Sequence, residues 1–207
     1  MDVFVPFDAL DPKSRLEPPL STVERIDFAH AMLTDVLDAV EAAGHDPTVL
    51  STAPMDIDAA VLIDERPLSK AVNSLVDLTE DPVAVVMADL PLATPGAIEG
   101  LLTVEADVVL APGIGGGTNA LVIRDGAFTA DFHGSSFADH RAIAEAAGLE
   151  VRTVDSFTLG LDIAEPADLP EVIIPSDRSA AGWLADRGFV VEADDTGRVR
   201  AVRRPDD

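Results

Sequence analysis

The chain has 207 residues, of which 47% are apolar and 25% are charged, a composition typical of a globular domain and not of a disordered chain. It contains no cysteine, which excludes disulfides, thiolate zinc sites and cysteine nucleophiles. The 38 acidic and 14 basic residues give a net charge of -24, which argues against nucleic acid as a partner because the phosphate backbone requires a basic surface.

The acidic residues are spread along the whole chain and form no run of five like charges. This pattern is typical of the solvated surface of proteins from salt-loving archaea, where high salt screens the self-repulsion. No apolar run approaches the roughly 20 residues that a membrane span requires, and residues 1–7 hold no basic stretch ahead of a long apolar segment. We therefore expect a cytoplasmic protein with no membrane partner.

Short apolar runs alternate with helical patterns, which predicts an α/β fold with a mostly parallel sheet and helices on both faces. The expected strands are residues 3–6, 48–51, 61–63, 83–87, 108–110, 120–123 and 151–154. The expected helices are residues 21–43, 68–78, 95–102 and 137–147, the first of which begins with a capping box of Ser21 and Glu24. We expect one domain over residues 1–207, in which residues 171–207 form an appendage with a helix at 179–187 and a hairpin at 189–202 that turns at 194–197.

The segments that follow strands are the informative ones, because ligands of open α/β sheets bind beyond the carboxyl ends of the strands. After the first strand, Lys13 and Arg15 lie two residues apart, and Lys13 is one of only two lysines in the chain. Cations at this place could clamp a triphosphate, whose charge would otherwise repel an incoming anion. The alternative is a solvated loop. The glycine-rich Walker loop is absent, which excludes that class of phosphate site.

Two aspartates are candidates for a magnesium site. Asp89 directly follows the run 83–87, which is the strongest candidate for a central strand, and Asp162 follows another strand-like run. Magnesium typically binds one or two carboxylates together with substrate phosphates, so we expect these two carboxylates to converge beyond the carboxyl edge of the sheet. The alternative for Asp89 is an ordinary surface carboxylate, because the chain has 26 aspartates.

Two further segments could form a ligand or anion site. The loop 113–117 has four glycines in five positions, so its amides can approach a ligand closely, and Thr118 and Asn119 add side-chain donors. The segment from Gly134 to Ser136 leads into a helix, whose N-terminus is a favourable place for an anion. The alternatives are a flexible hairpin loop for the first segment and a plain N-cap for Ser136.

Taken together, five segments resemble the 2-phospho-L-lactate guanylyltransferase family and occur in the order of that family. They are Lys13-Ser14-Arg15-Leu16, Asp89-Leu90-Pro91, Gly116-Gly117-Thr118-Asn119-Ala120-Leu121, Ser136-Phe137 with His140, and Leu161-Asp162-Ile163 followed by Pro166 and Asp168-Leu169. The Lys-Ser-Arg-Leu and Thr-Asn-Ala-Leu segments are the specific ones, whereas Asp-Leu-Pro is common to many nucleotidyltransferases. The family usually has an aromatic residue followed directly by Gly, ahead of the Ser-Phe; here His133 stands at that Gly position, directly after Phe132, and Gly134 comes one residue later.

The resemblance implies the Rossmann-like fold of nucleotide-diphospho-sugar transferases, a homodimer, Mg2+, and the substrates GTP and 2-phospho-L-lactate. The products would be lactyl-2-diphospho-5′-guanosine and pyrophosphate, in the biosynthesis of the deazaflavin coenzyme. By the same resemblance, Lys13 and Arg15 hold the triphosphate, and Asp89 and Asp162 hold the metal. It also implies that Thr118 and Ser136 hold the acid substrate. The full set of candidate substrate-binding residues is Gly117, Thr118, Asn119, Gly134, Ser135 and Ser136.

The sequence alone does not separate 2-phospholactate from phosphoenolpyruvate, or GTP from other nucleotides. The alternative enzyme is a nucleotidyltransferase for a sugar phosphate or the molybdenum cofactor, but such enzymes usually carry a glycine-rich first loop with arginine that residues 8–13 lack. A third interpretation is a non-catalytic nucleotide-binding module. In the enzyme, the acceptor phosphate is already an anionic nucleophile, so no histidine base is expected.

Overall fold

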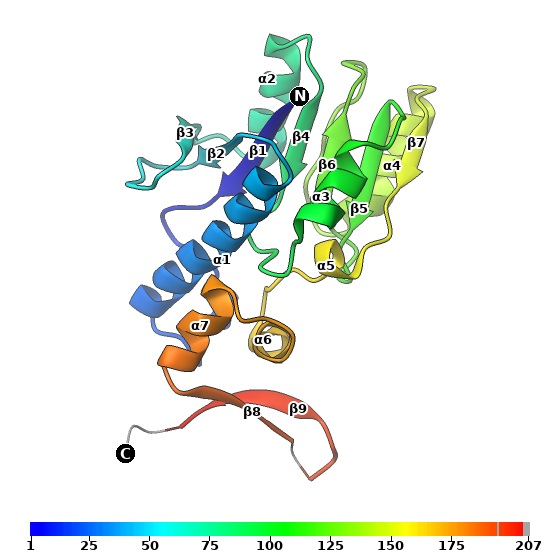
Figure 1. The fold of residues 1–207 in the computed structure, drawn as a ribbon. Helices are drawn as coiled ribbons and strands as arrows, with labels where there is room; N and C mark the ends of the chain where they lie inside the picture. The colour runs from blue at the N-terminus through cyan, green and yellow to red at the C-terminus, as the bar shows by residue number, and fades with distance from the viewer. Residues whose placement is uncertain (194, 205–207) are drawn as a thin grey trace.

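The fold is built on a seven-stranded sheet of order β3-β2-β1-β4-β6-β5-β7 in the computed structural model, which describes residues 1–193 and 195–204 (Figure 1). Its strands are β1 (Asp2–Phe7), β2 (Pro47–Ser51), β3 (Ala60–Ile63), β4 (Val83–Val86), β5 (Val108–Pro112), β6 (Thr118–Ile123) and β7 (Val151–Thr153). Strand β6 is antiparallel to β4 and β5, and the other neighbouring strands are parallel. The mostly parallel sheet expected from the sequence is confirmed.

Helices cover both faces of this sheet (Figure 1). The helices of the first face include α1 (Thr22–Ala42) and α3 (Pro95–Leu102), and those of the second are α2 (Leu68–Leu78) and α4 (Ser136–Ala146). Because successive side chains of a strand point to opposite faces, Val3 and Val5 of β1 enter the first core and Phe4 enters the second. Each expected strand and helix is present, with ends within two residues of the expected ones.

The longest helix, α1, begins where the sequence predicts. The side chain of Ser21 accepts a hydrogen bond from the backbone N–H of Glu24, and the side chain of Glu24 accepts one from the backbone N–H of Ser21. This reciprocal cap satisfies two amides that the first turn of a helix leaves without partners. The buried face of the helix carries mostly apolar side chains, but Arg25 and Asp35 are also buried there.

The terminal segment consists of α6 (Leu169–Ile173), α7 (Ser179–Asp186) and the hairpin of β8 (Phe189–Ala193) and β9 (Val199–Arg203). Leu184 of α7 and Phe189 of β8 belong to the same core as α1, whereas the hairpin extends away from the main sheet (Figure 1). Asp194, in the expected turn 194–197, lies outside the described residues, as do residues 205–207 of the expected domain.

A polar brace fastens this segment to the rest of the protein. The carboxylate of Asp35, which is 1% exposed, accepts the backbone N–H groups of Ser179 and Ala180 at 2.8 and 2.9 Å. The guanidinium of Arg178 donates to the carbonyl oxygens of Asp35, Pro91 and Ala93. The start of α7 is thereby joined both to α1 and to the loop that follows β4.

Two local features differ from the sequence analysis. The run before Asp162 is not a strand but the short helix α5 (Phe157–Gly160), which begins where the side chain of Ser156 accepts the N–H of Leu159 at 3.3 Å. Helix α6, and the single turns η1 (Ser14–Leu16) and η2 (Pro166–Asp168), were not expected. A hydroxyl cap favours a helical turn even where the side chains themselves suit a strand.

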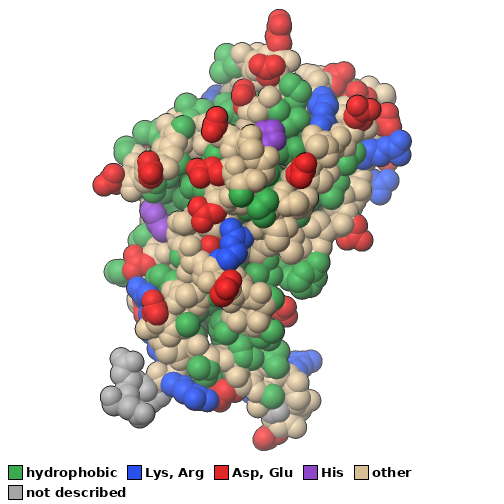
Figure 2. Space-filling view, in the orientation of Figure 1, with side chains coloured by type: hydrophobic (Ala, Val, Ile, Leu, Met, Phe, Trp, Pro, Cys, Tyr) green, Lys and Arg blue, Asp and Glu red, His purple; other side chains and the backbone are tan. Residues whose placement is uncertain are grey.

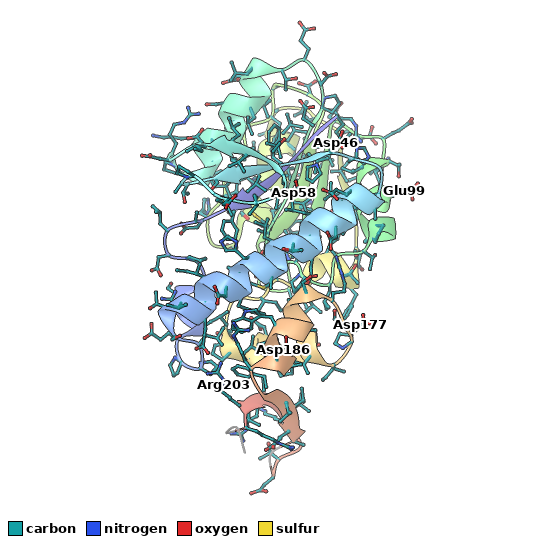
Figure 3. All side chains as sticks on the ribbon, turned by 60° about the vertical axis from the view of Figure 1, so that its left-hand side comes forward. Asp46, Asp58, Glu99, Asp177, Asp186 and Arg203 are labelled. Carbon is teal, nitrogen blue, oxygen red and sulfur yellow. The ribbon has the colours of Figure 1, made fainter. Side chains whose placement is uncertain are left out.

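Acidic side chains are scattered over the face seen in Figure 2 and do not gather in one patch. Figure 3 shows that the acidic side chains are also scattered on the side of α1. The five that it labels come from different segments and are all exposed: Asp46, Asp58, Glu99, Asp177 and Asp186. Within the described residues, no helix has the length and apolar character needed to cross a membrane.

Candidate active site

The end of β4, the start of β6 and the segment after α5 meet at one edge of the sheet. Because β6 is antiparallel to β4, its first residues lie beside the carboxyl end of β4. The backbone N–H of Met87 donates to the carbonyl oxygen of Asn119 at 2.9 Å, and that of Ile163 donates to the carbonyl oxygen of Asp89 at 3.0 Å. Asp89, Asn119 and Asp162 are thereby brought to the edge where ligands of such sheets bind.

A cavity of about 350 Å³ opens at this edge, beside the end of β1. The charged side chains in its lining are those of Asp8, Asp11, Lys13, Arg15 and Asp89. The Lys13 ammonium lies 2.5 Å from Oδ2 of Asp89, and the two side chains are 17% and 24% exposed. Lys13 has a left-handed backbone conformation, with φ 57° and ψ 39°, which residues other than glycine rarely adopt. The two cations expected from the sequence therefore line the same cavity as Asp89.

Asp162 is connected to the site through Asn119. The buried amide of Asn119 donates to the carbonyl oxygen of Leu159 at 2.9 Å and to Oδ1 of Asp162 at 3.2 Å. In the described part of the chain, Ala164 lines the cavity and Asp162 does not. No group of three or more His, Cys, Asp or Glu side chains among the described residues could hold a metal ion. A cation bound by Asp89 and Asp162 would therefore need further oxygen ligands from water or a substrate.

A buried polar cluster of Thr118, Ser136 and His140 lies at the start of β6. The N–H of Asp131 donates to Nε2 of His140 at 2.9 Å, so the proton of the neutral ring is on Nδ1, which donates to Oγ1 of Thr118 at 2.8 Å. Burial lowers the pKa of His140 to about 4, so the ring is neutral at physiological pH. Oγ of Ser136 accepts the backbone N–H of Thr118 at 3.0 Å. His140 thus orients Thr118 and joins α4 to the sheet.

The glycine loop 113–117 and the entrance to α4 lie side by side. The N–H of Phe137 donates to the carbonyl oxygen of Gly116 at 3.2 Å, and a Cβ on Gly117 would lie 4.0 Å from the carbonyl oxygen of Gly134. The amides of Gly113 and Gly116 donate to carbonyl oxygens of the loop itself, so these two amides are already used. The residues implied to bind the substrate are therefore neighbours, although the hydroxyls of Thr118 and Ser136 also bind each other at 3.4 Å.

A second cavity, of about 240 Å³, adjoins the first and extends toward β2 and β3. Asp8 lines both cavities, together with Pro6, Phe7 and Met87. Of the other lining residues of the second cavity, three are apolar (Leu50, Leu68 and Ala71) and three are polar or charged (Thr52, Asp64 and Arg66). The Arg66 guanidinium holds the pKa of Asp64 at about 2, so this carboxylate stays ionised.

Sequence reasoning missed three residues of this region. Asp8 and Asp64 each directly follow a strand, and that position was a signal that could have found them. Arg25 is 4% exposed and contacts the loop that carries Lys13. Its spacing of three and seven residues from the apolar Phe28 and Met32 places it on the buried stripe of the helix, which indicates a buried arginine.

Comparison with known proteins identifies the family. A sequence model of the family described as "Guanylyl transferase CofC like" matches residues 1–204. The chain belongs to this family. Two proteins named 2-phospho-L-lactate guanylyltransferase, from Natronomonas pharaonis and Haloferax volcanii, are each 52% identical to this CofC-like chain, over 99% and 98% of it and 100% and 98% of their own lengths. A third with that name, from Halobacterium salinarum, is 48% identical over 100% of both chains. The family resemblance is confirmed.

Solved structures show the same fold at low sequence identity. A protein from Desulfovibrio desulfuricans described as a candidate nucleotide-diphospho-sugar transferase matches with a TM-score of 0.70 and 15% identity, over 90% of this chain and 96% of its own. CMP:2-keto-3-deoxy-manno-octonic acid synthetase, in a structure with CTP, matches with a TM-score of 0.55 and 14% identity, over 82% and 95%. The expected fold of nucleotide-diphospho-sugar transferases is confirmed for this CofC-like guanylyl transferase.

Proposed function

We propose that this protein transfers the guanylyl group of GTP to 2-phospho-L-lactate. A phosphate oxygen of 2-phospholactate attacks the α-phosphorus of GTP, and the bond from that phosphorus to the bridging oxygen of the β-phosphate breaks. The products are lactyl-2-diphospho-5′-guanosine and pyrophosphate. The acceptor phosphate is already ionised, so the reaction requires no base, in agreement with a His140 that is buried and neutral. The names of the relatives at about half identity support this reaction.

The ion pair of Lys13 and Asp89 carries the proposal. Its two partners face each other at 2.5 Å in the lining of the larger cavity and have opposite charges. A complex of GTP with magnesium carries both charges that could replace the pair, because phosphate oxygens suit the ammonium and the cation suits the carboxylate. Arg15, an exposed residue of the same lining, would add a second cation for the triphosphate. Lys13 and Arg15 are therefore the proposed triphosphate clamp.

Asp89 and Asp162 fit the ligand set of magnesium, which binds one or two carboxylates and completes its shell with water and phosphate oxygens. The hydrogen bond from Ile163 to Asp89 keeps the two aspartates on adjoining backbone segments. Bound magnesium would supply positive charge beside the reacting phosphates. The two carboxylates would hold it from the protein side.

Two further parts of the protein suit the acid substrate and the nucleoside of GTP. We propose that the acid substrate binds over Gly117, Thr118 and Asn119 and the facing residues Gly134, Ser135 and Ser136, because hydroxyls and the N-terminus of α4 converge there. We propose that the nucleoside enters the smaller cavity, where apolar lining residues such as Phe7, Leu50 and Leu68 suit the faces of a purine. The end of β1 separates the two cavities and would lie beneath the bound nucleotide.

The decisive experiment measures pyrophosphate release by the purified protein with GTP, magnesium and 2-phospholactate in molar KCl. We expect release that depends on all three components. Parallel reactions with phosphoenolpyruvate, sugar phosphates, CTP and ATP test the neighbouring activities. If pyrophosphate is released with another acceptor or nucleotide but not with GTP and 2-phospholactate, the proposed substrates are wrong. If no combination releases pyrophosphate, the protein is a nucleotide-binding module and not an enzyme of this class.

Variants test the assigned residues. Lys13→Ala, Arg15→Ala and Asp89→Asn should each lower kcat/KM by about 10²-fold or more, because each removes charge that acts on the triphosphate or its metal. Lys70→Ala is the matched control, since Lys70 is the other lysine of the chain and is exposed on α2. If each loss of kcat/KM were accompanied by a matching loss of stability, seen as a lower melting temperature, the three residues would have a structural role.

We further propose that the protein works in the cytoplasm as a homodimer, in line with the resemblance to its family. Light scattering on the purified protein in molar KCl would measure the mass of the particle. A mass of one chain, 21.7 kDa, would contradict the dimer.

A further inference from the structure

Arg25 is a buried arginine of α1 that reaches the first loop of the candidate site. It is 4% exposed and shares the buried face of the helix with Phe28 and Met32. Its Nη1 donates to Oδ1 of Asp11 and to the carbonyl oxygen of Pro12, both at 2.9 Å. The guanidinium therefore holds the backbone immediately before Lys13.

The surroundings of Arg25 are not optimal for stability alone. Burial removes the hydration of a guanidinium, and an apolar side chain of similar volume would pack on the face of α1 without that penalty. Nε of Arg25 is buried and has no hydrogen-bond partner among the described residues. A buried guanidinium that leaves one N–H without a partner is expected where the side chain serves a nearby site.

Lys13 depends on such support because its backbone is unfavourable. With φ at 57°, it occupies the left-handed region, which persists in a residue other than glycine only when the surrounding structure holds it. On one side, the N–H of Leu16 donates to the carbonyl oxygen of Lys13 at 2.9 Å. On the other side, Arg25 fixes Pro12. Between these two anchors, the ammonium of Lys13 reaches Asp89.

Arg25 also balances negative charge beside the clamp. Asp11 lines the larger cavity, and Glu17 lies 3.8 Å from Nη2 of Arg25. Without the guanidinium, the Asp11 carboxylate would add unbalanced negative charge to a cavity that is proposed to receive a triphosphate. Both effects of Arg25 act on the same loop and favour the same ligand.

We propose that Arg25 is a positioning residue for the triphosphate: it holds residues 11–13 so that Lys13 meets the phosphates, and it screens Asp11. This inference rests on the function proposed above. Within the described residues Arg25 is not part of the lining of the cavity, so it acts through Lys13 and Asp11 and not by touching the substrate.

The test compares Arg25→Met and Arg25→Lys, each alone and in a Lys13→Ala background, as full-length proteins in molar KCl. Arg25→Met should lower kcat/KM for GTP by about tenfold to hundredfold, because small misplacement of a charged group is enough to cause such a loss. KM for 2-phospholactate should stay nearly unchanged, and Arg25→Lys should recover part of the loss. In the Lys13→Ala background, Arg25→Met should add little further loss, because the two residues act as one unit.

Arg124→Met is the matched control. Arg124 also donates to two backbone carbonyl oxygens, those of Leu102 and Ala106, but it follows β6 at the opposite edge of the sheet. The Arg124→Met variant should leave KM for GTP unchanged even if its melting temperature is lower.

Two outcomes would overturn the inference. The first is a double variant whose loss of kcat/KM for GTP is the product of the losses caused by Arg25→Met and Lys13→Ala alone. The second is an equal loss of kcat/KM for both substrates that parallels the loss in melting temperature. If Arg25→Met does not fold, Arg25→Lys enters the same comparison. If the unaltered protein turns over no substrate, the proposed function fails, and calorimetric binding of GTP with magnesium then tests Arg25 alone. Binding weakened about tenfold or more in the Arg25 variant would support its role, and equal binding would refute it.

Discussion

The buried carboxylate of Asp35 should contribute a large part of the stability of the terminal segment. Its two oxygens accept the N–H groups of Ser179 and Ala180 at 2.8 and 2.9 Å, at the first turn of α7. Asp35→Ala would leave both N–H groups without an acceptor. Ala180 is buried and its N–H would stay unpaired, whereas Ser179 is exposed and its N–H could bind water.

The expected loss follows from that difference. An unpaired buried N–H costs about 1–3 kcal/mol, and a lost helix cap costs about 1 kcal/mol. We therefore expect Asp35→Ala to lower the free energy of unfolding by about 2–4 kcal/mol, a large part of the roughly 5–15 kcal/mol of a typical domain. Asp35→Asn keeps one acceptor oxygen and should lose about half as much.

Urea denaturation in molar KCl, followed by fluorescence, measures this loss. Trp183, the only tryptophan of the chain, lies on α7 and packs against Phe28 of α1, so its emission reports on the docking of this helix. Asp38→Ala, an exposed aspartate of the same helix, is the control. A loss below about 0.5 kcal/mol in Asp35→Ala, as expected for a surface site, would refute the reasoning.

Three further predictions concern charge, pH and packing. The melting temperature should rise between low and molar KCl, because salt screens a net charge of -24, and an unchanged value would contradict the halophilic interpretation. The pKa of His140 falls from 6.5 to about 4 on folding, so the unfolded chain binds more protons between these values and stability falls as the pH falls. From pH 7.5 to pH 5 the loss in the free energy of unfolding should be about 2 kcal/mol. Urea denaturation of the His140→Gln variant should show no such loss. Gly113→Ala should lower both stability and activity, because its Cβ would lie 2.5 Å from Oδ1 of Asn119, whereas Gly115→Ala, with nothing within 4 Å, should be neutral in the same assays.

Local pattern predicted most of the fold. Apolar runs and caps located each strand of the sheet and its main helices, because burial on one face imposes a period that is visible in the sequence. The direction of β6 was also within reach, since the five residues between β5 and β6 are too few for the crossover that a parallel pair needs. The helix before Asp162 was missed because a single hydroxyl cap, at Ser156, decides its conformation.

The resemblance carried the candidate site further than local pattern could. Position after a strand selected Asp89, and the structure brings it to Lys13. The partners of the buried charges were not predictable in the same way. Arg25 binds residues 13 and 14 positions away, and Asp35 binds residues 144 and 145 positions away, so no local period records these contacts. Their burial on an apolar stripe was visible, but the groups that neutralise them were not.

The brace at Arg178 has a consequence for how the protein matures during synthesis. Arg178 holds the carbonyl oxygens of Pro91 and Ala93, just after Asp89. A nascent chain that has not yet emerged as far as Arg178 already contains every residue proposed to touch substrate, but the loop after β4 still lacks this support. Domains generally begin to fold from the N-terminus while the ribosome is still at work. The substrate pocket should therefore become rigid only after residue 178 has emerged, and a stop codon shortly before residue 178 would yield a chain that has every residue proposed to touch substrate but an unsupported loop after β4.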